Sequence, residues 1–377
     1  MFLRVVKPLI LVMFLSAALF LATDFVFGER LLHLIKVASR QDSFRIEHDS
    51  YHHTLASNFK GLGFWGNDSY PVCTNTYGMK ASCEEAKAEE KIFDIGFIGD
   101  SFTEGIGLPF EQTFVGMLSK NHPNLKIANL AVASYSPSIY LAKIKHLIDE
   151  GFVFRNIIVF VDISDIQDES VYRSVDGNIF IGTPPVKTRY SAIKRKLGQN
   201  FPLTAFAKRT LLKTKTDSGR YQAVEFEEAS EATPGYDNII ANQSIYSHGY
   251  ERSAWTYKPD TSGYGKLGVD GSISKALDNM GQLHKLLTKR DVGLSVAVYP
   301  WPGTLKYDQL DSKQVKIWED FCKDKCDKFY NLFTPFFAEA ARTTVDAVIS
   351  KYFFKDDVHL NAEGNSLIAT QLLNEGL

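Results

Sequence analysis

Residues 93–105 read FDIGFIGDSFTEG, an apolar run that ends at Gly99 and is followed at once by Asp100 and Ser101. The run has the composition of a buried parallel strand, and Gly105 can close the turn that follows it. Such a strand would deliver Ser101 to the edge of a sheet. A serine hydroxyl is a poor nucleophile without an adjacent base. The rest of the chain must therefore supply a histidine and a carboxylate if Ser101 is to react.

Strand and helix signals alternate from residue 91 onward. We expect strands at 92–98, 126–130, 156–161, 294–299 and 328–332, and helices at 111–120, 138–150, 272–289, 312–325 and 362–374. Strands that alternate with helices favour right-handed crossovers and a parallel sheet. The predicted fold class is α/β, and there is no internal repeat, Gly-x-Gly-x-x-Gly motif or phosphate loop.

The alternation stops at about residues 170–270, a stretch with two adjacent prolines, a basic segment around 194–196 and an acidic patch at 225–231. A connection this long is uncommon inside a compact domain unless it carries elements of its own. We interpret it as an insertion over the sheet, with a lid or cap as its hypothetical role.

Composition sets broad limits on function. The 377 residues are 45% hydrophobic and 23% charged, with a formal net charge of −2. These values are those of an ordinary globular protein rather than a disordered one. The near-neutral charge gives no electrostatic reason to expect a nucleic-acid partner.

The N-terminal residues 1–28 are predicted to anchor the chain in a membrane. Arg4 and Lys7 precede an apolar run that extends to Phe27, and about 20 such residues span a bilayer core. The small-x-small pattern of a cleaved signal peptide is poor here, because Phe20 lies two residues before Ala22. Positive charge on the short leading side favours a single-pass inner (cell) membrane protein with its main domain extracytoplasmic, in the periplasm or outside the cell.

Residues 29–90 are expected to form an irregular membrane-proximal segment, with residues 91–377 as the main domain. In an oxidising compartment, Cys73–Cys83 and Cys322–Cys326 are the most economical disulfides. The nearby His48, His52 and His53 lack an acidic or cysteine partner at ligand spacing. We therefore expect neither a metal nor another cofactor.

A second segment, 353–361, reads FFKDDVHLN and precedes the last predicted helix. His359 can act as the base for Ser101 if a carboxylate holds its other ring nitrogen and stabilises the imidazolium. Asp356 and Asp357 both lie close enough in sequence to do so. Ser101, His359 and one of these two acids form a candidate catalytic triad.

The two segments together resemble those of the SGNH (GDSL-type) hydrolase family. Residues 99–105 are similar to its first block and 356–359 to its last, and the resemblance covers about residues 91–165 and 272–377. It implies a flavodoxin-like three-layer α/β fold and acyl-ester chemistry on Ser101. It also implies an oxyanion hole built from the backbone N–H of Ser101 and two donors from the middle blocks.

The middle blocks depart from the family pattern. The second falls at 129–134, with Ala131 where the family has glycine, and the third at 162–165, with Ser164 in place of an asparagine. The family's Asp-x-x-His form selects Asp356 as the acid. The Asp-x-His form, typical of membrane-anchored SGNH-like polysaccharide O-acetyltransferases, selects Asp357, which we slightly favour.

The resemblance and the anchor together lead to a functional expectation. We expect an acyl-ester enzyme that acts on an exported or cell-surface polysaccharide, as O-acetylesterase or as O-acetyltransferase; the family implies that a transferase would have a multi-spanning membrane partner. Trp301, between two prolines at a strand's carboxyl end, is a candidate for stacking on a substrate ring. Alternatives are a non-catalytic polysaccharide-binding or assembly subunit and a lipid-directed esterase.

Overall fold

The computed structural model describes residues 2–38, 42–66, 68–84, 90–181, 200–211, 252–259 and 261–377. They belong to two compact units, which are Met1–Ser43 with Pro184–Arg220, and Phe44–Thr183 with Tyr221–Leu377. The basic segment at 194–196 and the acidic patch at 225–231 lie outside the described residues, as does most of the expected insertion.

In the part of the first unit that the structure describes, the chain forms the helices α1 (Phe2–Ala38) and α7 (Pro202–Leu211). Within α1, the 22 residues Leu11–Leu32 have a mean hydropathy of 2.0, which makes the helix long and apolar enough to cross a membrane; a signal sequence would have the same property. Asp24 interrupts this apolar stretch. Its carboxylate accepts hydrogen bonds from the N–H of Leu203 (2.8 Å) and the N–H of Thr204 (2.7 Å) at the start of α7.

The second unit is built on a five-stranded parallel sheet with the strand order β11-β10-β7-β5-β6. The strands are β5 (Ile92–Ile98), β6 (Ile127–Asn129), β7 (Val153–Val161), β10 (Gly293–Val298) and β11 (Lys328–Asn331). Numbered along the chain, this order is 2-1-3-4-5, the flavodoxin-like arrangement. The predicted α/β fold with a flavodoxin-like sheet is therefore confirmed.

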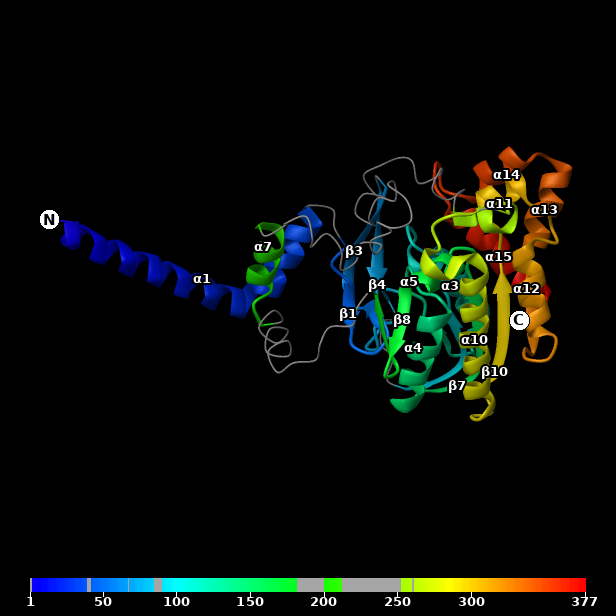
Figure 1. Cartoon of the computed structure of the whole chain (residues 1–377), viewed down its shortest axis with the longest axis horizontal. Helices are drawn as coiled ribbons and strands as arrows, with labels where there is room; N and C mark the ends of the chain where they lie inside the picture. Colours follow the sequence, from blue (N-terminus) through cyan, green and yellow to red (C-terminus); the bar gives the residue numbers. More distant parts are fainter. Residues whose placement is uncertain are drawn as a thin grey trace. The chain divides into compact units, whose positions relative to one another are not determined.

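Helices cover both faces of this sheet (Figure 1). Right-handed crossovers place α3 on one face and α4 and α10 on the other, because the chain reverses its direction of travel across the sheet after β6. Helix α15 packs on α3, while α10 packs on α4 and α5. The bounds are α2 (Ser101–Glu104), α3 (Phe114–Asn121), α4 (Pro137–Asp149), α5 (Asp165–Val171), α10 (Gly268–Thr288), α11 (Pro302–Tyr307), α12 (Lys313–Cys322), α13 (Phe333–Arg342), α14 (Val345–Tyr352) and α15 (Ala362–Asn374).

Most element boundaries lie within a few residues of those predicted, and α3 shows why one of them moved. The predicted helix at 111–120 is a 3₁₀ turn at Phe110–Gln112 followed by α3. The Thr113 hydroxyl accepts a hydrogen bond from the N–H of Gly116 at 3.1 Å, so Thr113 is the N-cap and the helix begins after it.

The segment expected to be irregular, residues 29–90, instead contains two antiparallel ribbons. One pairs β1 (Arg45–His48) with β2 (His52–Leu55), and the other pairs β3 (Lys60–Trp65) with β4 (Asp68–Cys73). A third ribbon, β8 (Tyr172–Val175) with β9 (Asn178–Ile181), follows α5. Both predicted disulfides, Cys73–Cys83 and Cys322–Cys326, are present.

The three histidines of the first ribbon serve packing and backbone contacts. The ring of His48 stacks on Tyr51, with centroids 3.6 Å apart. The Nδ1 atoms of His52 and His53 lie 2.8 Å apart, and His53 Nε2 donates to the carbonyl of Ala133 at 2.7 Å.

The first ribbon is joined to α2 by a buried ion pair. Arg45 donates to both carboxylate oxygens of Glu104, at 2.7 and 2.6 Å, and the Glu104 side chain is 1% exposed. Burial alone acts to raise the pKa of Glu104, but the Arg45 charge and hydrogen bonds hold it below its usual value. The N–H of Ala133 also donates to Glu104, at 2.8 Å. Glu104, the last residue of α2, therefore ties the first ribbon to the main sheet.

Breaking this pair should destabilise the second unit. Arg45→Met leaves the buried Glu104 charge without its main partner, a loss that typically costs about 3–5 kcal/mol. Denaturant unfolding of the full-length protein in detergent measures the change. Arg155→Met is the matched control, because Arg155 is 83% exposed in its contact with Asp94, and we expect a change below about 1 kcal/mol there. Equal effects of the two substitutions would contradict a structural role for the buried pair.

Candidate active site

The chain turn after β5 places Ser101 at the carboxyl edge of the sheet. Asp100 is the N-cap of α2, and its Oδ1 accepts the N–H of Phe102 at 3.0 Å. Gly99 is required because a Cβ there would lie 2.3 Å from Thr103 Oγ1. Gly105 ends the helix with φ of 74°, a left-handed conformation that favours glycine. The local sequence thus forces a tight strand-to-helix turn with Ser101 as its first helical residue.

This turn lies at the point where the strand order reverses direction. The neighbours β5 and β7 lead into helices on opposite faces, and such a switch point is where ligands bind in open α/β sheets. Ser101 follows β5, and the segment from Asp162 to Asp165 follows β7. The topology therefore brings the first and third sequence blocks together.

His359 comes from the loop between α14 and α15. Its backbone carbonyl accepts the N–H of Phe354 at 2.9 Å, and Asn361 caps α15 by accepting the N–H of Gly364 at 3.0 Å. The Asn361 side chain also donates to the carbonyl of Phe353 at 3.1 Å. These contacts close the loop on itself and fix the position of His359.

Ser101, His359 and Asp357 form a continuous hydrogen-bonded chain. The distance from Ser101 Oγ to His359 Nε2 is 2.8 Å, and the distance from His359 Nδ1 to Asp357 Oδ1 is also 2.8 Å. Between the two acids left open by the sequence, the geometry selects Asp357. Asp356 is exposed and has φ of 57°, so the chain turns at this residue and its side chain has no contact with His359 among the described interactions.

The environment of Asp357 favours its ionised form. Burial acts to raise its pKa, but the His359 charge and the hydrogen bonds of His359 and Trp65 hold the pKa below its usual value. The indole Nε1 of Trp65 donates to Oδ2, and the N–H of Val358 donates to Oδ1 at 2.6 Å. An ionised Asp357 can hold the Nδ1 proton of His359 and leave Nε2 free to accept a proton.

Sequence reasoning missed Trp65. It lies at the end of β3, in the segment expected to be irregular, and its ring packs on His359 with centroids 4.8 Å apart. Phe102 packs against the same imidazole, also at 4.8 Å. No local spacing pattern links Trp65 to His359, because the contact depends on the tertiary placement of the ribbon.

The two middle-block residues expected to donate to an oxyanion are engaged elsewhere. The N–H of Ala131 donates to Asn129 Oδ1 at 3.1 Å, and both the N–H and the hydroxyl of Ser164 donate to Asp162 Oδ1. These are Asx-turns, in which the side-chain oxygen of an Asn or Asp at the end of a strand accepts a hydrogen bond from the N–H of the residue two positions later. The N–H of Ser101 has no intrahelical acceptor, because it is in the first turn of α2.

Trp301 also differs from expectation. It lies just beyond the carboxyl end of β10 as predicted, but its side chain faces inward and is 3% exposed. Its indole N–H donates to Asp162 Oδ2 at 2.7 Å, and its ring stacks on Phe102 with centroids 5.7 Å apart. The ring therefore is not an exposed platform for a sugar in this structure. Its indole N–H instead donates a hydrogen bond to the buried carboxylate of Asp162.

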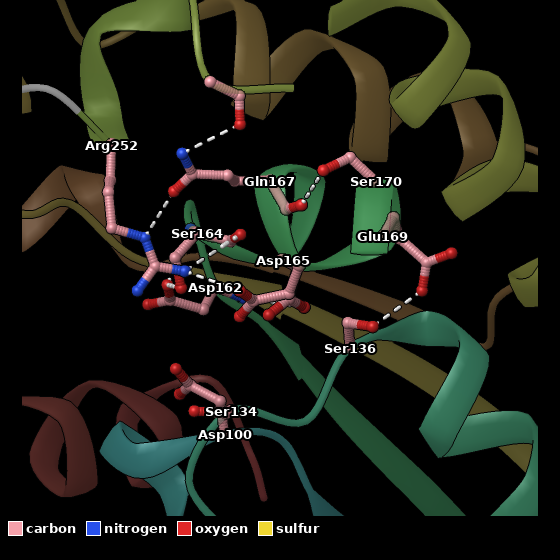
Figure 2. A network of polar contacts seen from close by, with 12 residues as sticks. Asp100, Ser134, Ser136, Asp162, Ser164, Asp165, Gln167, Glu169, Ser170 and Arg252 are labelled. Atoms are coloured by element: carbon pink, nitrogen blue, oxygen red, sulfur yellow. Dashed lines mark hydrogen bonds and ion pairs between the residues drawn. The ribbon is translucent and has the colours of Figure 1, made fainter. Parts of the chain in front are cut away.

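A cluster of buried carboxylates lies beside Ser101. One oxygen from each of Asp100, Asp162 and Asp165 falls within 4.8 Å of the others, and among the described residues this is the only group of His, Cys, Asp and Glu side chains close enough to hold a metal. Arg252 reaches over this cluster (Figure 2) and donates to Asp168 at 2.8 Å. Burial raises the pKa of Asp168 to about 6, although Arg252 opposes the shift.

The solved structures reported below are similar to this chain at only 11–12% sequence identity. No protein-family model matches the sequence, and no curated protein matches it. The esterase EstA from Pseudoalteromonas sp., inhibited by monoethylphosphonate, is 11% identical with a TM-score of 0.36, covering 76% of this chain and 96% of its own. A member of the lipolytic G-D-S-L family from Veillonella parvula is 12% identical with a TM-score of 0.36, covering 75% and 97%. A catalytic mutant of the acetylxylan esterase Axe2 from Geobacillus stearothermophilus is 11% identical with a TM-score of 0.38, covering 75% and 93%. Structural similarity this low carries no information about the chemistry of the site.

The geometry predicts different roles for the two adjacent acids. Asp357→Asn should lower the rate at which a fluorophosphonate labels Ser101 by about 10³-fold, because the amide no longer stabilises the imidazolium or its tautomer. Asp356→Asn is the matched control and should label at the wild-type rate, since this side chain is exposed. Labelling is measured by intact mass over time. Equal losses for both variants, or a loss only for Asp356→Asn, would rule out Asp357 as the orienting acid.

Proposed function

We propose that this protein is a serine-dependent acyl-ester enzyme in which Ser101 is the nucleophile, His359 the general base and acid, and Asp357 the orienting acid. The observation that carries the proposal is the unbroken chain Ser101 Oγ–His359 Nε2, His359 Nδ1–Asp357 Oδ1, with both distances at 2.8 Å. These distances lie within the range for proton transfer between positioned groups.

The reaction follows from the positions of the protons. Ser101 Oγ attacks the acyl carbonyl carbon while its proton passes to His359 Nε2. The tetrahedral intermediate collapses, the ester C–O bond breaks, and His359 gives that proton to the leaving alcohol. Water or a sugar hydroxyl then attacks the acyl-serine, its proton again passing to His359, and Ser101 Oγ leaves with that proton. Asp357 stays ionised throughout and stabilises the imidazolium.

We further propose an exported or cell-surface polysaccharide as the substrate, with the enzyme acting as O-acetylesterase or O-acetyltransferase. The support is the location implied by the chain. Helix α1 is long and apolar enough to cross a membrane, and two disulfides suit an oxidising compartment. A catalytic unit anchored at the outer surface of the inner membrane would meet glycans as they emerge. A transferase would receive acyl groups from a multi-spanning membrane partner.

A second candidate function is a non-catalytic polysaccharide-binding or assembly subunit that retains the fold. The observation that favours it is the state of the expected oxyanion donors, since Ala131 and Ser164 are both engaged by neighbouring side chains. One missing oxyanion donor typically costs about 2.7–4 kcal/mol of transition-state stabilisation. The site as it stands is therefore better equipped to activate Ser101 than to stabilise an oxyanion.

Hydrolysis of a chromogenic acetyl ester separates the two candidates. Full-length wild-type protein in detergent should release the chromophore, and Ser101→Ala should lower kcat by at least about 10³-fold. Ser119→Ala, in helix α3, is the matched control and should keep the wild-type rate. If wild type and Ser101→Ala behave alike, the catalytic proposal fails and the binding subunit is favoured.

The same assay distinguishes the finer alternatives. An added acceptor oligosaccharide that gains acetyl mass indicates transfer, whereas release of free acetate alone indicates hydrolysis. Preference for long-chain over acetyl esters would instead indicate a lipid-directed esterase.

A further inference from the structure

Ser101 Oγ has two hydrogen-bond neighbours but only one proton. It lies 2.8 Å from His359 Nε2 and 3.1 Å from Asp100 Oδ2. General-base catalysis requires that the hydroxyl proton point at His359. If Asp100 were ionised, it would be an acceptor only and would compete with His359 for that proton. The protonation state of Asp100 therefore decides which way the Ser101 hydroxyl points.

The orientation of the Asp100 carboxyl group is fixed by its other contacts. Oδ1 accepts the N–H of Phe102 at 3.0 Å and the hydroxyl of Tyr299 at 3.2 Å. Oδ2 is consequently the oxygen that faces Ser101. A proton on Asp100 belongs on Oδ2, because both donors already occupy Oδ1.

Hydrogen-bond counting in the carboxylate cluster identifies which members are neutral. Both oxygens of Asp162 receive donors, namely the N–H of Ser164 at 2.7 Å on Oδ1 and the indole N–H of Trp301 at 2.7 Å on Oδ2. Asp162 therefore has the surroundings of an ionised carboxylate. Asp165 Oδ2 accepts the Tyr140 hydroxyl at 2.8 Å, while its buried Oδ1 has no partner.

Among the residues that the structure describes, two oxygens of the cluster thus lack a dedicated donor. These are Asp165 Oδ1, and Asp100 Oδ2, whose only described hydrogen-bond neighbour is the Ser101 hydroxyl. All three carboxyl groups are buried, and one oxygen of each lies within 4.8 Å of the others. Several negative charges so close together in a buried site repel one another strongly. We therefore expect some of these carboxylates to be protonated. The two oxygens without a donor are the positions at which protons fit, so one proton is assigned to Asp100 Oδ2 and one to Asp165 Oδ1.

The charges that face Asp100 agree with this assignment. Burial and then the Asp162 charge raise the pKa of Asp100 well above its usual value, and burial followed by Asp100 and Asp162 does the same for Asp165. The guanidinium of Arg252, which is close enough to interact with Asp100, is hydrogen-bonded to Asp168. The titratable and charged groups around Asp100 are Asp162, Asp165 and Asp168 after β7, Tyr140 of α4, Arg252, Tyr299 directly after β10, and His359.

We propose that Asp100 is a neutral carboxylic acid that donates its Oδ2 proton to Ser101 Oγ, and so acts as a positioning residue that directs the Ser101 proton to His359. The proposal rests on the proposed role of Ser101 as nucleophile. Asp100 keeps its proton through the reaction, and the proton that moves is the one that passes between Ser101 and His359. Burial and the neighbouring Asp162, which accepts hydrogen bonds from Ser164 and Trp301, both raise the pKa of Asp100.

This assignment sets the sign of the pH dependence. The active form contains neutral Asp100, so activity is complete below its pKa and is lost as pH rises through that raised value. The pH–rate profile therefore has an alkaline limb, which belongs to Asp100 within the coupled cluster.

Asp100→Asn tests the proposal directly in the full-length protein. With Oδ1 held by Phe102 and Tyr299, the amide Nδ2 takes the place of Oδ2 and donates to Ser101 permanently. We expect kcat/KM for the chromogenic acetyl ester to stay within about threefold of wild type at neutral pH, and the alkaline limb to disappear. Asp100→Ala, which lacks the donor, should lose about tenfold or more. Asp165→Asn is the matched control and should retain an alkaline limb, because its side chain does not touch Ser101.

Other outcomes overturn the proposal. Wild-type hydrolysis that depends on Ser101 but is abolished in Asp100→Asn would show that an ionised acceptor is required. An unchanged alkaline limb in Asp100→Asn would show that the limb does not report Asp100. Loss of wild-type activity in EDTA, with recovery on added Mg²⁺, Ca²⁺ or Mn²⁺, would show that the cluster holds a cation rather than protons. In each of these cases the role of Ser101 stands, whereas equal rates for wild type and Ser101→Ala would mean that the proposed function itself has failed.

Infrared spectroscopy provides a readout that does not depend on activity or on the folding of a variant at position 100. At neutral pH the wild-type protein should show the C=O stretch of protonated carboxyl groups, weakened but still present in Asp165→Asn. Absence of this band from the wild-type protein at neutral pH would overturn the proposal.

Discussion

The hydrogen bond between Ser101 Oγ and His359 Nε2 joins residues that are 258 positions apart. It forms because Ser101 directly follows β5 at the carboxyl edge of the sheet, and the loop between α14 and α15 brings His359 within hydrogen-bond distance of it. Each partner is fixed by its own local structure, Ser101 by the Asp100-capped turn and His359 by a loop closed on itself through Asn361. The rest of the second unit holds these two short segments in fixed positions relative to each other.

Part of that support comes from residues 44–83, which precede the sheet in sequence but contact the site. Arg45 holds Glu104 of α2, Lys80 donates to the carbonyl of Gly105 at 2.7 Å, and Trp65 donates to Asp357. This segment thus contacts both the turn that carries Ser101 and the Asp357 side chain. In the proposed enzyme this segment contributes to catalysis by fixing geometry rather than by supplying a reacting group.

The fold, Ser101 and His359 could be predicted from the sequence because each depends on local pattern. The β-branched run at 156–161 and the turn after Gly99 can be recognised from the sequence alone. The same is true of the position of His359 before a capped helix. The choice between Asp356 and Asp357 required the backbone, since the left-handed conformation of Asp356 turns its side chain away. Trp65 and the inward orientation of Trp301 were not predictable, because both depend on contacts between elements distant in sequence. The engagement of Ala131 and Ser164 by Asn129 and Asp162 is local, but it depends on turn geometry that residue identity alone does not specify.

The most direct measurement of the central claim is peptide-level mass spectrometry after incubation of the full-length protein with a fluorophosphonate. The account predicts one adduct, on Ser101, that forms with wild-type protein and is absent from His359→Ala. Labelling of another serine in preference to Ser101, or labelling of Ser101 at the same rate without His359, would contradict the assignment of Ser101 and His359 as nucleophile and base.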